Sequence, residues 1–108
     1  MKLVVAIIHD EDSHDLIERL TEKKYGVTKL ASTGGFLRSG NTTLLVGVEK
    51  EKVDDVIDTI KEVCKTRKEI TTTAPIVGDS SSFMAIPIEV VVGGATIFVL
   101  DIERFEKA

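Results

Sequence analysis

Residues 33–48 read TGGFLRSGNTTLLVGV, a glycine-rich loop that runs into a β-branched and apolar segment. From Gly35 to Thr42 the chain differs at one position from the phosphate-binding pattern G-x-x-x-x-G-K-[ST]. That pattern needs a lysine to reach the β and γ phosphates and a helix N-terminus to receive them. Here Asn41 takes the place of the lysine, and residues 42–48 have no helical periodicity. The stretch therefore predicts a loop followed by a strand, and it excludes a P-loop nucleotide triphosphatase.

Strand and helix patterns alternate on both sides of this stretch. The predicted elements are strands at 3–8, 27–31, 42–48, 70–73, 88–92 and 96–100, with helices at 12–26 and 50–66. We expect the first helix to begin at Asp12 or Ser13 and to end at Gly26 in a left-handed cap. We expect the last two strands to form a hairpin through a type I′ turn at Gly93 and Gly94. The order β-α-β-β-α-β with an extra C-terminal strand predicts an α+β, ferredoxin-like sandwich.

The composition is that of one soluble globular domain covering residues 1–108, with 43% hydrophobic and 30% charged residues. The net charge is −4 and the basic residues are scattered, so nucleic acid is not an expected partner. The apolar run at 3–8 is followed at once by acidic residues, and it is too short for a signal peptide or a membrane span. We therefore expect a cytoplasmic protein without membrane insertion.

One face of the predicted sheet has no helix to cover it. Apolar residues occupy both faces of the strand at 42–48, and the strand at 3–8 is apolar on both faces as well. Two helices cover only one side, and an uncovered apolar face of several hundred Å² usually marks an interface. The pattern therefore predicts a homo-oligomer formed through the sheets, with a closed ring as the natural symmetric arrangement.

The residue types that most often carry catalysis or metal binding have structural explanations here. The acidic and histidine-bearing run is His9, Asp10, Glu11, Asp12, His14 and Asp15. It lacks the glycine of an EF-hand loop, and acids in a first helical turn are explained by the helix dipole. The single cysteine, Cys64, lies on the apolar stripe of the second helix and is expected to be buried. We predict no metal site, no cofactor and no enzyme, because no nucleophile, base and orienting group are visible together.

The glycine-rich loop combines features that a simple turn does not explain. Phe36 and Leu37 are apolar in a polar loop, so a ligand or partner is expected to cover them. Asn41 offers an amide with both donors and an acceptor, which suits the edge of a base, and Gly47 weakens an apolar strand where a ligand can approach the backbone. Together these residues predict a flat aromatic ligand. The connection at 75–87 is either a second functional loop or a disordered connector.

Over nearly its whole length the chain resembles the PII-like cyclic di-AMP receptor family (PstA type). The resemblance is carried by TGGFLRSGNTTLLVGV, by VTKLAS before it and by IEVVVGGATIFVL near the C-terminus. It implies a ferredoxin-like fold and a homotrimer that binds cyclic di-AMP in clefts between neighbouring subunits. It also implies signal transduction to a downstream protein, whose identity the sequence does not give.

The resemblance assigns roles to particular residues. The ligand-binding residues that it implies are Thr28, Gly35, Phe36, Leu37, Asn41, Gly47 and Phe98. Thr28 and Asn41 would hydrogen-bond one adenine, with a backbone contact from Gly47. Residues 35–37 would line the pocket of that base, and Phe98 would lie beside the second base. The loops at 36–41 and 76–86 would correspond to two mobile loops that rearrange on binding.

The chain departs from the family pattern at two places. Family members often carry an arginine where this chain has Gly26, and a glutamine near the position of Lys107. The missing guanidinium is expected to weaken phosphate or base contacts.

Two other functions share this order of elements. A PII-like sensor of ATP and a metabolite would need clustered basic residues, whereas the loop offers chiefly Arg38. An ACT-like amino-acid-binding module would leave Phe36 and Asn41 without a role.

Overall fold

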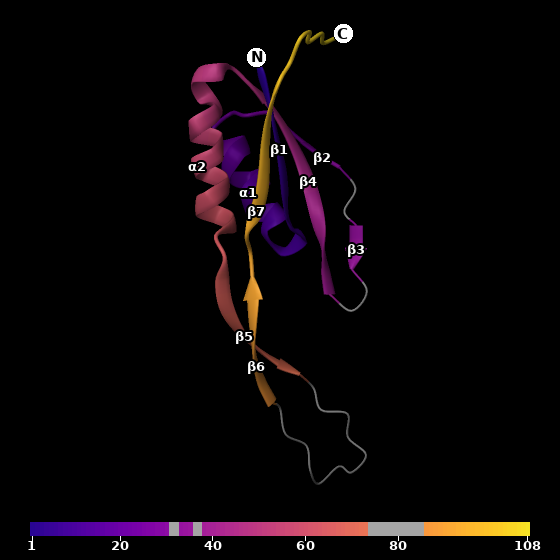
Figure 1. The fold of residues 1–108 in the computed structure, drawn as a ribbon, viewed down its shortest axis with the longest axis vertical. Helices are drawn as coiled ribbons and strands as arrows, with labels where there is room; N and C mark the ends of the chain where they lie inside the picture. Colours follow the sequence, from indigo (N-terminus) through magenta and orange to yellow (C-terminus); the bar gives the residue numbers. More distant parts are fainter. Residues whose placement is uncertain (31–32, 36–37, 74–85) are drawn as a thin grey trace.

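The computed structural model describes residues 1–30, 33–35, 38–73 and 86–108, and Figure 1 shows their arrangement. The chain runs β1 (Lys2–His9), α1 (Asp10–Glu22), β2 (Val27–Lys29), β3 (Thr33–Gly35), β4 (Arg38–Val48), a 3-10 turn (Lys50–Lys52), α2 (Val53–Cys64), β5 (Arg67–Thr73), β6 (Ile86–Val92) and β7 (Ala95–Asp101). In the described part of the chain, no helix is long and apolar enough to cross a membrane.

The body of the molecule is an antiparallel sheet with the strand order β2-β4-β1-β7, and β3 pairs with the free end of β4. Both helices pack on the same side of this sheet (Figure 1). The predicted α+β, ferredoxin-like fold is therefore confirmed. β5 and β6 form a separate two-stranded ribbon that extends beyond the body (Figure 1).

The core lies between the sheet and the two helices. Alternate side chains of β1 and β4 point into it, and the helices add their apolar stripes. The fully buried residues from the two strands are Val4, Ala6, Ile8, Thr42, Leu44 and Val46, and those from the helices are Leu16, Leu20, Val56, Thr59, Ile60 and Cys64. In the described part of the chain, the opposite face of the sheet has no helix over it, as the sequence predicted.

The first helix differs from the prediction at both ends. α1 begins at Asp10, with His9 as the N-cap, rather than at Asp12 or Ser13. The residue with a left-handed backbone is Lys24, at φ 69°, and not Gly26. The N–H groups of Lys24 and Tyr25 close the helix by donating to the carbonyls of Thr21 and Leu20, respectively. The glycine pattern misplaced the cap because these backbone bonds, rather than residue type, set where the helix stops.

The hairpin predicted at Gly93 and Gly94 is wrong. Both glycines do have positive φ, at 86° and 90°. However, β6 pairs with β5 in the ribbon, while β7 pairs with β1 in the main sheet. The two glycines therefore connect a strand of one sheet to a strand of another.

Candidate functional site

The register of the strands places three of the expected ligand-binding residues on the uncovered face of the sheet. Leu45 of β4 lies opposite Thr28 of β2 on one side and opposite Val5 of β1 on the other. Val5 in turn lies opposite Phe98 of β7. Since residues directly opposite in an antiparallel pair share a face, these four side chains form one row across the sheet. Gly47 shares this face, two residues further along β4.

Asn41 also belongs to this face but lies at its other end. It stands opposite His9 of β1, four residues from Leu45 along β4. At the rise of a strand this distance is about 14 Å. Thr28 and Asn41 of one chain therefore lie at opposite ends of this face rather than side by side.

The side chains on this face are accessible. Phe98 is 51% exposed, as is Leu100 beside it on the same face. Thr28 and Asn41 are exposed too, and Leu45 is half-buried. An apolar row flanked by hydroxyl and amide groups suits a ligand that is flat and apolar in the middle and polar at its edges.

An open hollow of about 310 Å³ lies around Asn41. Its lining consists of Ile7, His9, Asn41, Gly93, Gly94, Ala95 and Thr96. It therefore joins the end of the uncovered face to the connection between β6 and β7. The sequence patterns assigned no ligand-binding role to His9. Strand alternation could have indicated that His9 lies on this face, because His9 continues the series of Leu3, Val5 and Ile7. The prediction missed it because β1 ends one residue later than predicted.

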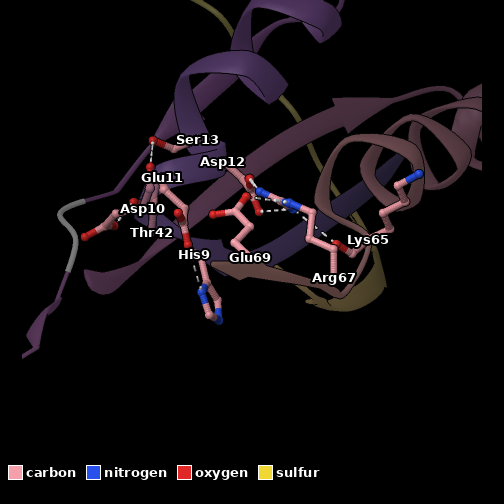
Figure 2. Close-up of polar contacts among 9 residues, drawn as sticks. All are labelled: His9, Asp10, Glu11, Asp12, Ser13, Thr42, Lys65, Arg67 and Glu69. Carbon is pink, nitrogen blue, oxygen red and sulfur yellow. Dashed lines mark hydrogen bonds and ion pairs between the residues drawn. The ribbon is translucent and has the colours of Figure 1, made fainter. Parts of the chain in front are cut away.

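The acidic start of α1 serves the fold, as Figure 2 shows. The hydroxyl of Thr42 donates to Asp10, and the backbone carbonyl of Asp10 accepts from Ser13 at 2.8 Å. Asp12 is nearly buried and accepts two hydrogen bonds from Arg67, at 2.7 and 3.4 Å. These bonds raise the pKa of Arg67 above its usual value. Among the residues whose surroundings are described, no three His, Cys, Asp or Glu side chains are placed to share a metal ion.

Cys64 is buried in the core, as predicted, with 1% of its surface exposed. Burial raises the pKa of its thiol to about 12, so it carries no thiolate near neutral pH. It is therefore a small apolar core residue rather than a nucleophile.

Three of the expected ligand-binding residues are seen incompletely. Gly35 pairs with Arg38 where β3 meets β4. Phe36 and Leu37 lie outside the described residues, as does the segment 74–85, so their predicted roles stay predictions. Gly26 is exposed, and apart from its chain neighbours no atom of the described residues lies within 4 Å of where a Cβ would stand, so the position leaves room for a larger side chain.

Known proteins share both the sequence pattern and the fold. A family model described as cyclic-di-AMP receptor matches residues 1–108. A solved structure of a functionally unknown protein from Pediococcus pentosaceus is 40% identical, with a TM-score of 0.77, and the match covers 99% of this chain and 96% of that one. The PII protein of Arabidopsis thaliana, solved with citrate, has a TM-score of 0.59 at 22% identity, over 94% of this chain and 73% of that one, and so shows the fold alone.

Proposed function

Because this chain belongs to the cyclic-di-AMP receptor family, we propose that it binds cyclic di-AMP at the subunit interfaces of a homotrimer. Ligand binding then rearranges the segment at 36–41, whose residues 38–41 begin β4, and the segment at 76–86, and a partner protein responds to the change. The protein acts in this proposal as a cytoplasmic receptor and does not break any bond of the ligand.

The observation that carries the proposal is the division of the expected site between two ends of one uncovered face. Thr28 and Gly47 lie at one end and Asn41 at the other, about 14 Å away by strand rise. A second chain packed on the same face would bring the Thr28 end of one subunit to the Asn41 end of its neighbour. The apolar residues of the row that crosses the sheet at the Thr28 end would then be buried by the same contact, which removes the cost of leaving them in water.

Signalling in this proposal depends on differential binding. A ligand shifts a conformational equilibrium only by the difference between its affinities for the two states. Residues 35–37, which line the pocket in this proposal, run from the end of β3 to the start of β4. A loop arrangement that closes on the base is therefore stabilised by the ligand, and its surface becomes available to the partner.

Isothermal titration tests the proposal. The purified protein is titrated with cyclic di-AMP, cyclic di-GMP, ATP and AMP. We expect heat with cyclic di-AMP at micromolar concentration, one site per chain, and much weaker binding of the other three. Tighter binding of ATP would support the PII-like sensor of ATP, and no heat with cyclic di-AMP at tens of micromolar would contradict the proposal.

Asn41→Ala tests the site itself. Losing the amide leaves the edge of a base without a partner, so we expect affinity for cyclic di-AMP to fall by about tenfold or more. Thr21→Ala, on the exposed side of α1, is the control and should bind like the wild type. Chromatography of the ligand after incubation should return it intact, and a hydrolysis product would show an enzyme instead.

A further inference from the structure

His9 occupies a position in the hollow that the family resemblance does not assign. It stands directly opposite Asn41 in the register of β1 and β4, so the two side chains lie next to each other on the uncovered face. Both line the hollow of about 310 Å³, together with backbone of Gly93 and Gly94. The imidazole is 37% exposed, so it is accessible to a ligand. In Figure 2 it points away from the carboxylates of Asp10 and Asp12.

The charges around the hollow make His9 distinctive. A cyclic dinucleotide carries two phosphodiester anions, and anions in proteins are held by charge-assisted hydrogen bonds. Among the described residues that line the hollow, His9 is the one whose side chain can carry a positive charge. From β4 and β7 the lining offers Asn41 and Thr96, which are uncharged.

Glu11 orients the imidazole for this role. Its carboxylate oxygen lies 3.7 Å from Nδ1 of His9, so Nδ1 faces Glu11 and Nε2 faces away from it. The other carboxylate of this turn, Asp10, is engaged by the hydroxyl of Thr42. With Nδ1 directed at Glu11, the second nitrogen of a protonated ring is free to donate.

We propose that His9 is a ligand-binding residue of the same site, and that its protonated imidazole donates from Nε2 to a phosphodiester oxygen of the nucleotide whose base Asn41 contacts. The inference rests on the proposed binding of a cyclic dinucleotide at this face. It gives the site a cationic donor in a chain that has Gly26 where family members often carry an arginine.

Nuclear magnetic resonance of the wild-type protein tests the contact with His9 itself unchanged. The chain has two histidines, and His14 is an exposed residue of α1 whose ring is 88% accessible. His14→Gln assigns the two sets of ring signals. On adding cyclic di-AMP, we expect the signals of His9 to move toward those of a protonated ring and to saturate with the ligand, while the signals of His14 stay in place.

Titration of variants measures the contribution to affinity. His9→Gln keeps an N–H donor, now from an amide, but removes the positive charge, so we expect binding to weaken by about tenfold. The control His14→Gln should bind within twofold of the wild type. Unmoved His9 signals at saturation, or a His9→Gln affinity within twofold of the wild type, would overturn the inference and leave the proposed function standing. If the wild type bound no cyclic di-AMP, both would fail.

Discussion

Single residues explain how the helices are held against each other. Lys24 adopts a left-handed backbone, which an L-residue with a side chain adopts at a cost. The contacts of the residues on either side of Lys24 offset this cost. Lys23 donates to one carboxylate oxygen of Asp55 at 3.1 Å, and the hydroxyl of Tyr25 donates to the other at 2.5 Å. The bond from Tyr25, and then that from Lys23, hold the pKa of Asp55 below its usual value. The turn at Lys24 therefore directs the side chains of Lys23 and Tyr25 to Asp55 of α2 and so joins the two helices.

Lys24→Gly should stabilise the protein. Glycine adopts the left-handed conformation without a steric penalty, so we expect the free energy of unfolding to rise by about 1 kcal/mol. Thermal and urea unfolding measure the change. Lys24→Ala is the control, because it removes the same charge but keeps Cβ, and it should not stabilise. A glycine variant no more stable than the alanine variant would contradict the strain argument.

Cys64 gives a prediction that depends on pH. Its folded pKa of about 12 lies above the ordinary value of a thiol, so the folded state holds the proton more tightly than the unfolded state. This contribution to stability is complete below about pH 8.5 and is lost as the pH rises from there toward 12. At pH 8 the folded protein should react with iodoacetamide at least about a thousandfold more slowly than the unfolded chain. Equal rates in native buffer and in guanidinium would show an accessible thiol.

At the scale of elements, the joint between β6 and β7 decides where the ribbon lies. The N–H of Gly94 donates to the carbonyl of Cys64 at the end of α2. A Cβ on Gly93 would overlap the carbonyl oxygen of Lys65 and come within 2.8 Å of Arg67. The two glycines thus let the chain pass close against the turn that leads from α2 into β5. The ribbon and the hollow around Asn41 share this joint.

Gly93→Ala and Gly94→Ala form a matched pair that tests the joint. Both place a side chain at positive φ, which costs about 1–2 kcal/mol. At Gly94 the added Cβ comes no closer than 3.2 Å, to the hydroxyl of Thr66, so we expect only that cost. At Gly93 the overlap with backbone adds to it, for a total of about 2–5 kcal/mol. Urea unfolding compares the two, and equal losses would show that the close approach at Gly93 is unimportant.

At the scale of the whole molecule, the uncovered face is the feature that a single chain leaves unexplained. Phe98 and Leu100 are each 51% exposed on it, next to half-buried apolar residues of β1. The opposite face is covered by the helices. Such asymmetry is typical of a sheet that packs against a further copy of itself.

Phe98→Glu tests this association. A carboxylate on the uncovered face would be desolvated in an oligomer, so we expect light scattering to show a mass near that of one chain, against three times that mass for the wild type. Val99→Glu is the control, since Val99 has a similar exposure, 43%, but points to the other face. A trimer that survives Phe98→Glu would place the interface elsewhere. Circular dichroism confirms that both variants are folded.

The sequence by itself determined the layers of the fold and the polarity of its faces. Alternation along β1 and β4 and the apolar stripes of the helices depend on local periodicity, and local periodicity can be read without coordinates. The same is true of Cys64, whose position on an apolar stripe predicted its burial. The ligand-binding role of Asn41 stays a prediction.

Only the tertiary structure decided which residues meet. Strand pairing joins segments far apart in the chain, and neither turn type nor composition at Gly93 and Gly94 shows that β6 pairs with β5 and not with β7. Register likewise separates Thr28 from Asn41 and sets His9 beside Asn41. These are long-range contacts fixed by the packing of whole elements, whereas sequence patterns report only on the residues within one element.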